Sequence, residues 1–409
     1  MANYVTHLES ALDGTQLPAD RLQTLHAGRP LWVRYDLPAV SAAMSKDIVA
    51  QRPPTMWRYR ELLPLGTDFP EVTLGEGMTP LVACPRIGRS LGLSQLIVKD
   101  ESQLPTGSFK SRGLAMAITM AKRFGVTRVA IPTAGNAGGA AAAYAARAGI
   151  QAYVFMPEDT PVVNQYETAM AGAKVFLVNG LINDCARLVR EGQQAIGWFD
   201  LSTLKEPYRI EGKKTMGLEL AEQFDWQLPD VILYPTGGGT GLIGMWKAFH
   251  ELQSIGWLDS AKLPRMVAVQ SDGCSPIVKA FDSGNRFAEE CQGAATCASG
   301  LRVPAAIGDF MILDAVRESS GRAVAVPESE IVNWTRRVCS AEGISLCPEA
   351  ACCFAALEQL VREGWIEADQ RVVVFNTGAI QKYVEVMKCE LPRLAADQAV
   401  NWREIAATE

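Results

Sequence analysis

The sequence predicts an α/β fold with parallel β-sheets and a functional site in a cleft between two domains. Short apolar or β-branched runs recur along the chain, helix-like segments separate them, and glycine-rich turns follow several of them. Such alternation predicts parallel sheets, because a crossover helix must carry the chain back to the start of the next strand. The predicted strands are 129–131, 153–156, 174–178, 231–234, 266–269 and 372–375.

Size and charge limit the class of protein. With 409 residues, 48% of them apolar, the chain is long enough to bury at least two cores. A net charge of −6 argues against a nucleic-acid surface, which needs basic residues to replace counterions. No apolar run reaches the roughly 20 residues that cross a bilayer, and the polar N-terminus does not resemble a signal peptide. We therefore expect a cytoplasmic protein with no nucleic-acid or membrane partner.

Histidine and cysteine usage limits the chemistry. The three histidines leave almost nothing from which to build a Ser-His-Asp triad or a multi-histidine metal site. None of the ten cysteines forms a C-x-x-C pair, and Cys352 and Cys353 fall in an apolar helical pattern. We expect reduced thiols and no metal site.

Several segments can be assigned in chain order. Residues 1–75 are mixed in character and predict an arm that wraps around a larger body. Helices are predicted over 111–124, with one apolar face, and over 136–148, which is almost wholly small residues. The polar last 20 or so residues predict a surface tail.

Lys110 is the first candidate for chemistry. A Pro/Gly turn, Pro105-Thr106-Gly107, leads directly into a helix and places Lys110 in its first turn. The positive end of the helix dipole disfavours an ammonium there and helps to lower its pKa toward that of a nucleophile. The alternative is an ordinary lysine on a solvated helix start.

Two glycine-containing turns predict anion sites, since each follows a strand and opens a helix with free backbone amides. The residues from Thr133 through Ala134, Gly135 and Asn136 to Ala137 suit a carboxylate; alternatively, Asn136 is only an N-cap. The second turn, with Gly237, Gly238, Gly239, Thr240 and Gly241, suits a phosphate. Its spacing matches neither the ATP loop nor the dinucleotide fingerprint, which argues against a nicotinamide dehydrogenase.

Thr377 follows the last predicted strand and offers one neutral donor, although such a hydroxyl is often only a turn residue. A reactive lysine, a carboxylate loop, a phosphate cup and a neutral donor are what pyridoxal phosphate and an amino-acid substrate require together.

The run from about residue 75 to 383 resembles the fold-type-II pyridoxal-phosphate enzymes, and within them the threonine synthases. The resemblance covers about three quarters of the chain. The segments that carry it are GEGMTPL, KDESQLPTGSFKSRG, TAGNAGGAAAAYAARAG, EPYRIEGKKTMGLEL, PTGGGTGL, RVPAAIGDFMIL and PEAACCFAALEQL.

The resemblance implies a role for each matching residue. Lys110, after Phe109, would form the Schiff base with pyridoxal 5'-phosphate, Asn136 would contact the phenolic oxygen, and Thr377 the pyridine nitrogen. Residues 237–241 would hold the cofactor phosphate, and residues 133–137 the substrate carboxylate. Arg209 would bind a substrate phosphate; the alternative is a structural ion pair with Glu206 or Glu211.

Some residues depart from the family pattern. Ser111 replaces the aspartate of SFKDRG, and TGAIQK replaces a C-terminal motif that contains a histidine. Thr203 and Leu204 stand where some relatives offer asparagine and serine to the substrate phosphate. The cysteines of a zinc ribbon are missing before Arg34.

The resemblance also implies two three-layer α/β/α domains. We expect an N-terminal arm (1–75) without a zinc ribbon, a large cofactor-binding domain (76–114 and 206–385), a small movable domain (115–205), a C-terminal tail (386–409) and a homodimer. The implied reaction converts O-phosphohomoserine and water to threonine and phosphate. The alternatives are a threonine or serine dehydratase, a β-replacement enzyme similar to cysteate synthase, and a regulator that only binds the cofactor.

Overall fold

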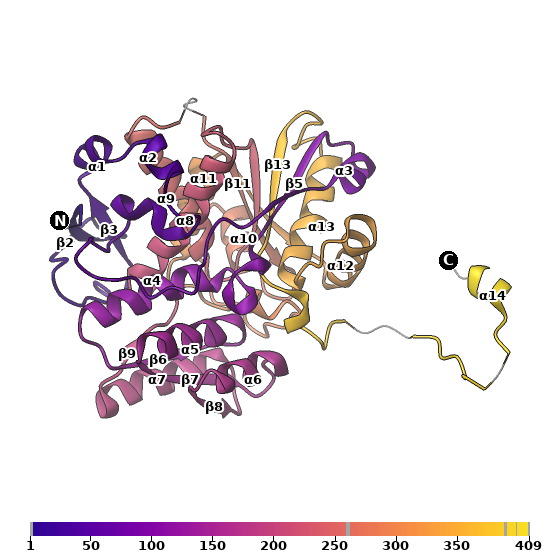
Figure 1. The fold of residues 1–409 in the computed structure, drawn as a ribbon, viewed down its shortest axis with the longest axis horizontal. Coiled ribbons are helices and arrows are strands. Elements are labelled where there is room, and N and C mark those ends of the chain that lie inside the picture. The colour runs from indigo at the N-terminus through magenta and orange to yellow at the C-terminus, as the bar shows by residue number, and fades with distance from the viewer. Residues whose placement is uncertain (1–2, 259–261, 388–390, 398, 408–409) are drawn as a thin grey trace.

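Two parallel sheets form the centre of the molecule, and a small antiparallel sheet lies beside them (Figure 1). The computed structural model describes residues 3–258, 262–387, 391–397 and 399–407. Its mixed α/β architecture confirms the predicted fold class, and each strand predicted from the sequence is present.

The larger sheet has six strands in the order β12-β11-β10-β13-β5-β4. Only β4 runs antiparallel to its neighbour. The strands are β4 (Leu81–Ala83), β5 (Gln95–Asp100), β10 (Val231–Pro235), β11 (Arg265–Ser271), β12 (Arg322–Val326) and β13 (Arg371–Asn376).

Helices cover both faces of this sheet, so its strands are apolar on both sides. Along β10, Val231 and Leu233 point to the core shared with α3, α12 and α13, whereas Ile232 and Tyr234 point to the core shared with α8 to α11. The helices are α3 (Pro85–Leu91), α8 (Tyr208–Gln223), α9 (Thr240–Ser254), α10 (Pro276–Asp282), α11 (Asp309–Glu318), α12 (Glu328–Glu342) and α13 (Pro348–Arg362).

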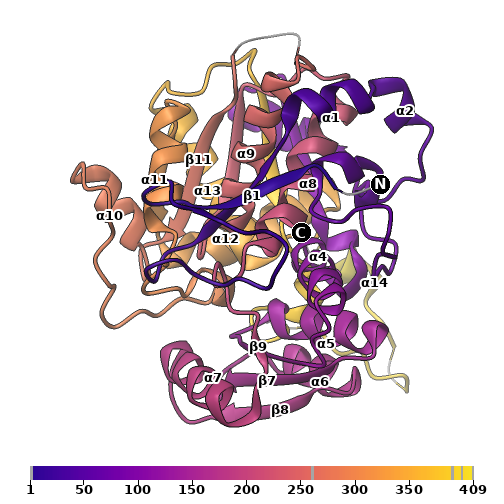
Figure 2. The ribbon, with the colours of Figure 1, turned by 90° about the vertical axis from the view of Figure 1, so that its left-hand side faces the viewer.

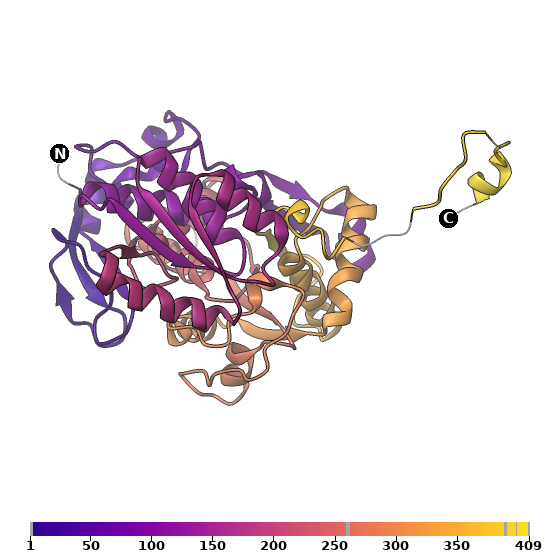
Figure 3. The same cartoon turned by 90° about the horizontal axis from the view of Figure 1, so that it is seen from below.

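The smaller parallel sheet has the order β8-β7-β6-β9. It lies with its helices below the larger sheet in Figure 2 and faces the viewer in the view from below (Figure 3). Helix α5 packs closely against its neighbours because its glycines have no side chain. A Cβ on Gly138 would lie only 2.7 Å from the Met156 side chain. The elements are β6 (Arg128–Pro132), α5 (Asn136–Ala148), β7 (Gln151–Pro157), α6 (Val162–Met170), β8 (Lys174–Val178), α7 (Ile182–Ile196) and β9 (Phe199–Asp200).

Helix α4 (Lys110–Arg123) lies between the two parallel sheets and contacts both α5 and α8. The sequence predicts one apolar face for it, with Leu114 and Ile118. The structure buries this face and also Met116 and Thr119, so residues 111–121 are buried on every face, whereas Lys122 near the end of the helix is exposed.

The N-terminal arm is a folded layer on α8 and α9. It contains β1 (Val5–Ser10), β2 (Gln16–Leu17), β3 (Leu31–Tyr35), α1 (Leu37–Ala43), α2 (Lys46–Ala50) and the 3₁₀ helix η1 (Met56–Leu62). Val40 and Tyr59 of the arm pack with Leu218 and Leu252 of the two helices. The Tyr35 hydroxyl donates to Glu211 Oε2 at 2.6 Å, which fixes the arm to α8.

Short 3₁₀ turns complete the body, and the C-terminal segment extends away from it to α14 (Trp402–Ala407) (Figure 1). Every cysteine that the structure describes is free. No cluster of potential metal ligands is found within the described ranges. Likewise, none of the helices described is long and apolar enough to span a membrane. The predicted domain boundaries and the movement of the small domain stay predictions.

Candidate active site

A cleft of about 320 Å³ lies at the carboxyl ends of β6, β10 and β13, where parallel sheets commonly bind ligands. It brings together residues that are far apart in sequence, and all but one of the predicted site residues line it. Those that do are Phe109, Lys110, Thr133, Ala134, Gly135, Asn136, Ala137, Gly237, Gly238, Gly239, Thr240, Gly241 and Thr377.

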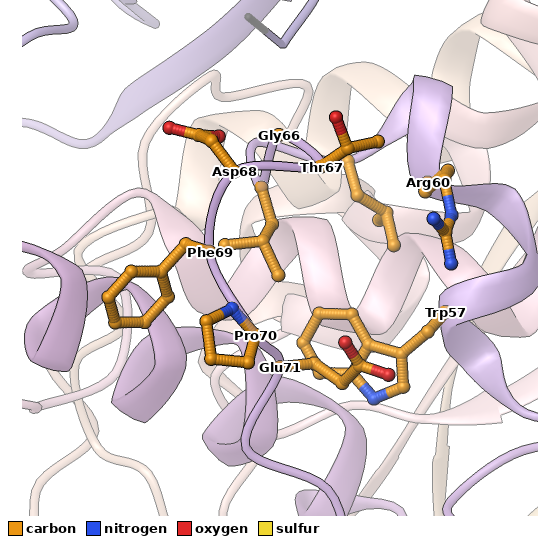
Figure 4. Close-up of a pocket in the computed structure, with 10 residues that line it drawn as sticks. Trp57, Arg60, Gly66, Thr67, Asp68, Phe69, Pro70 and Glu71 are labelled. Atoms are coloured by element: carbon orange, nitrogen blue, oxygen red, sulfur yellow. The ribbon is translucent and has the colours of Figure 1, made fainter. Parts of the chain in front are cut away.

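A second cavity, of about 300 Å³, lies in the N-terminal arm (Figure 4). Trp57 and Arg60 of η1 and the loop 66–71 line it. None of the predicted site residues contributes to this cavity.

Lys110 begins α4 directly after a strained turn. Thr106 and Gly107 both have positive φ, 62° and 61°, in the 3₁₀ turn η3 (Pro105–Gly107). The backbone amide of Phe109 donates to the Thr377 carbonyl at 3.0 Å, which ties the start of α4 to the end of β13. The turn therefore places Lys110 where the two sheets meet.

Arg112 anchors the first turn of α4. Its Nε donates to Glu101 Oε2 at 2.7 Å, and its Nη1 to Glu219 Oε2 at 2.8 Å. Lys99 also contacts Glu219, and all four side chains are fully enclosed. Removing one member would leave a buried charge without its partner, so the network holds α4 rigidly to β5 and α8.

The surroundings of Lys110 favour its neutral form. Burial lowers its pKa to about 7, the Arg209 guanidinium acts in the same direction, and the Glu349 carboxylate opposes them. Lys213 lies close by, because its Nζ donates to the Phe109 carbonyl and sits 3.9 Å from the centre of the Phe109 ring. Burial and the nearby Lys110 lower the pKa of Lys213 well below its usual value.

The glycine turn between β10 and α9 leaves little room for side chains. A Cβ on Gly237 would lie 2.5 Å from the Gly300 carbonyl oxygen, and one on Gly238 would lie 2.8 Å from the Thr203 methyl group. Gly239 has φ +72°, in the region that glycine adopts most readily. The first amides of α9 have no acceptor within the helix, so the turn forms a cup for an anion.

Asn136 does not act as an N-cap. It is the first residue of α5, Gly135 is the capping residue, and the helix start has no side-chain cap. Instead, Asn136 Nδ2 donates to the Tyr383 hydroxyl at 2.9 Å, while Oδ1 is buried without a partner. The Asn136 amide is therefore oriented by a residue from the C-terminal part of the chain.

Thr377 is 4% exposed, and its hydroxyl lies 3.5 Å from the Cys347 thiol, a weak partner. The hydroxyl thus keeps its capacity to bond a ligand in the cleft.

Arg209 is the predicted residue that does not line the cleft. It is fully buried in the first turn of α8, and its Nη1 donates to the Leu201 carbonyl at 2.8 Å. Its Nε and Nη2 have no partner. Thr203 and Leu204 line the cleft beside it, and Leu204 has φ 63°, unusual for a leucine.

Neither glutamate proposed as a structural partner forms an ion pair with Arg209. Glu206 accepts from the backbone amide of Tyr208 at 2.7 Å and so caps the start of α8. Glu211 pairs with Lys214 at 2.7 Å and Lys247 at 2.6 Å. The structural ion pair considered for Arg209 is thus absent from the described contacts.

Several lining residues were not anticipated from the sequence, notably Tyr234, Ser299, Glu349 and Tyr383. Glu349 had one detectable signal: it is an acidic residue at the start of the apolar segment 348–357. The other three carry no comparable signal.

The cleft fits a phosphorylated aromatic aldehyde. Asn136 Oδ1, Tyr234 Oη, Ser299 Oγ and Glu349 Oε2 line it but are buried without partners. Buried polar atoms normally have hydrogen-bond partners, so this clustering indicates a bound polar molecule. A lysine of lowered pKa and an anion cup of bare glycines lie in the same cleft.

The family model for pyridoxal-phosphate-dependent enzymes matches residues 72–378. The chain belongs to this enzyme family. The enzyme is 34% identical to the threonine synthase of Methanocaldococcus jannaschii over 358 residues, 87% of this chain and 88% of the relative. It is 36% identical to that of Methanosarcina acetivorans, covering 88% of each chain.

Solved structures share the fold of this enzyme. Maize serine racemase has a TM-score of 0.64 at 22% identity, covering 74% of this chain and 88% of the racemase. The processed threonine deaminase of Solanum lycopersicum also has a TM-score of 0.64, at 20% identity, covering 76% and 87%. The predicted fold-type-II class and the pyridoxal-phosphate cofactor are thus confirmed.

The lowered pKa of Lys110 predicts how the cofactor-free enzyme reacts. Its rate of covalent pyridoxal-phosphate attachment should rise with pH up to about 7 and then level off, because only the neutral amine attacks an aldehyde. If the lysine had its usual pKa of about 10.4, the rate of attachment would continue to rise until the pH reached about 10.4. Stopped-flow absorbance from pH 6 to 9 measures the profile, with a free lysine derivative as the control for ionisation of the cofactor. A midpoint near that of the free derivative would contradict the prediction.

Proposed function

We propose that the enzyme converts O-phosphohomoserine and water to threonine and phosphate. The observation that carries the proposal is the buried guanidinium of Arg209: its Nε and Nη2 are unpartnered, and its Nη1 lies 3.4 Å from the hydroxyl of Thr203, which lines the cleft. A buried cation with free donors is costly unless an anion joins it, and a guanidinium fork suits phosphate oxygens. The threonine synthases that this chain resembles support the same choice.

In this proposal, different residues of the cleft bind different parts of the cofactor. Lys110 would hold the aldehyde end of the cofactor, residues 237–241 would hold its phosphate, Asn136 would donate to its phenolic oxygen and Thr377 would bind at its pyridine nitrogen. When bound, pyridoxal phosphate supplies an electron sink that weakens bonds to the substrate α-carbon.

The protein residues then orient the substrate and move protons. Backbone amides at 133–137 bind its carboxylate at the start of α5, and Arg209 binds its phosphate. Lys110 would take the α-proton of the substrate and later return it. Its pKa near 7 suits this exchange, because both protonation states are populated at neutral pH.

Arg209→Met tests the substrate. We expect kcat/KM for phosphate release from O-phosphohomoserine to fall by about 10²-fold, equivalent to ~3 kcal/mol for a charge-assisted contact. Cofactor absorbance should be unchanged. The melting temperature should stay the same or rise, because the variant removes a buried cation that has two unpartnered donors.

Arg209→Lys is the matched control for this test, since it keeps the charge and removes the fork; its loss should be smaller. Ammonia and threonine are assayed alongside phosphate with O-phosphohomoserine, threonine and O-phosphoserine as substrates. Ammonia from threonine, with no phosphate released from O-phosphohomoserine, would favour the dehydratase. Phosphate release at the wild-type rate by Arg209→Met would rule out this mode of substrate binding. The homodimer and the cytoplasmic location stay predictions.

A further inference from the structure

The side chain of Tyr234 has no part in the proposed roles above, yet it lies at the glycine cup. Tyr234 stands near the carboxyl end of β10, is 1% exposed and lines the cleft. Its hydroxyl oxygen is buried without a hydrogen-bond partner. A buried tyrosine hydroxyl normally has a partner, and a phenylalanine would fill the same space without leaving a polar atom unpaired. The hydroxyl therefore calls for a ligand as its partner.

The Tyr234 hydroxyl occupies the place of a side chain that the cup lacks. A Cβ on Gly241 would overlap this oxygen and lie 2.8 Å from the ring atom Cε1. Gly241 is the second residue of α9, where the backbone amides have no acceptor within the helix. Because the Cα–Cβ bonds of a helix tilt toward its N-terminus, the hydroxyl stands on the side of these open amides. An anion bound to them would come within its reach.

Neighbouring aromatic rings hold Tyr234 in place. The Phe109 ring packs against it edge to face, with ring centres 6.0 Å apart and planes at 80°. The centre of the Phe375 ring lies 5.4 Å away. Phe109 directly precedes Lys110, and Phe375 stands two residues before Thr377. The hydroxyl is thus fixed relative to the residues proposed for the aldehyde and the pyridine nitrogen.

The Tyr234 hydroxyl keeps its proton at neutral pH. Burial, followed by the Glu101 carboxylate, raises the pKa of Tyr234 well above its usual value. The side chain therefore remains a hydrogen-bond donor, whereas an ionised tyrosine would repel an anion. A phosphate is a strong acceptor for it, because hydrogen bonds to an ionised oxygen are shorter and stronger than neutral ones.

We propose that Tyr234 is a cofactor-binding residue, whose hydroxyl donates a hydrogen bond to the phosphate of pyridoxal phosphate. It supplies the side-chain donor that Gly241 does not offer. This assignment rests on the glycine cup as the proposed site of that phosphate. The cup then holds the phosphate through backbone amides together with one rigidly placed hydroxyl.

Tyr234→Phe tests this role, since it removes only the hydroxyl and keeps the ring between Phe109 and Phe375. Pyridoxal phosphate, and pyridoxal as the same aldehyde without the phosphate, are each titrated into the cofactor-free enzyme and followed by absorbance. We expect the dissociation constant for pyridoxal phosphate to rise by about 30-fold, the equivalent of ~2 kcal/mol for one hydrogen bond to a charged group. The dissociation constant for pyridoxal should be unchanged. The phosphorus NMR signal of the bound cofactor should shift, whereas its visible absorption maximum should not.

Tyr208→Phe is the matched control for this test. The Tyr208 hydroxyl is likewise buried without a partner, but Tyr208 lies outside the cleft. Its variant should bind both aldehydes as the wild type does. Without cofactor, neither variant should melt below the wild type, because each loses an unpartnered buried hydroxyl. In Tyr234→Phe alone, a fixed concentration of pyridoxal phosphate should raise the melting temperature less than in the wild type, since that rise follows affinity.

Two results in Tyr234→Phe would overturn the assignment. One is an unchanged affinity for pyridoxal phosphate. The other is an equal loss of affinity for pyridoxal, which would show that the hydroxyl acts away from the phosphate. Wild-type affinity in a folded Gly238→Asp protein would overturn the proposed cup, and the Tyr234 assignment with it. The two failures are distinct, because a failure of Tyr234 alone leaves the loss of affinity in Gly238→Asp intact.

Discussion

Replacing Lys110 with alanine is expected to lower kcat/KM by about 10⁴-fold, the upper end of the range for a proton-transfer residue. In the proposed assignment, the variant loses both the amine that would attach the cofactor and the base that would move the α-proton. Because the Arg112 network holds the start of α4 independently of Lys110, the fold should persist. Steady-state assays of phosphate release measure the loss, and the melting temperature checks folding.

The site of attachment is tested separately. Borohydride reduction of the cofactor-loaded enzyme, digestion and mass spectrometry should place the pyridoxyl group on Lys110. Lys213 is the natural competitor, because it is a second buried lysine against the Phe109 ring with a lowered pKa. Lys213→Met is the matched control and should leave the label on Lys110. A pyridoxyl group on Lys213 in the wild type would show that the assignment is wrong.

Charged side chains around Lys110 shift its pKa in opposite directions. Arg209 lowers the pKa values of both Lys110 and Lys213, whereas Glu349 raises the pKa of Lys110. Anionic parts of a ligand should therefore lie toward Arg209 and the glycine cup.

The strands and their ends could be predicted from the sequence because both depend on local patterns. An apolar run such as 231–234 needs only its own residues to identify it, and the glycine turn after it follows directly in the chain. Parallel strands bring their carboxyl ends to one edge, so Lys110, Asn136 and Thr377 were predicted to meet, and they line one cleft.

Other features depend on packing between distant segments, which local patterns do not report. The bond from Asn136 to Tyr383 joins residues separated by 247 positions. The burial of α4 on all sides follows from its place between two sheets, since its own sequence has an ordinary helical pattern. The position of Arg209 behind Thr203 and Leu204 likewise depends on a backbone turn with positive φ at a leucine.

Gly238→Asp is expected to weaken pyridoxal-phosphate binding by about 10³-fold, the equivalent of ~4 kcal/mol for two like charges about 4 Å apart near a protein surface. The carboxylate would stand in the cup proposed for the cofactor phosphate. Gly238 is a cleaner position than Gly239, where positive φ and contact of an added Cβ with Ile312 would strain the fold as well. At Gly238 the added Cβ meets only the Thr203 side chain, at 2.8 Å.

Gly238→Asn is the matched control, because it adds nearly the same volume without the charge. The difference between the two variants therefore measures repulsion alone. Cofactor titration followed by absorbance gives the dissociation constants, and circular dichroism confirms folding of both proteins. The aspartate variant should also bind more tightly as salt is raised, since screening weakens the repulsion. Equal affinities for the two variants, or wild-type affinity in a folded Gly238→Asp protein, would place the cofactor phosphate elsewhere in the cleft.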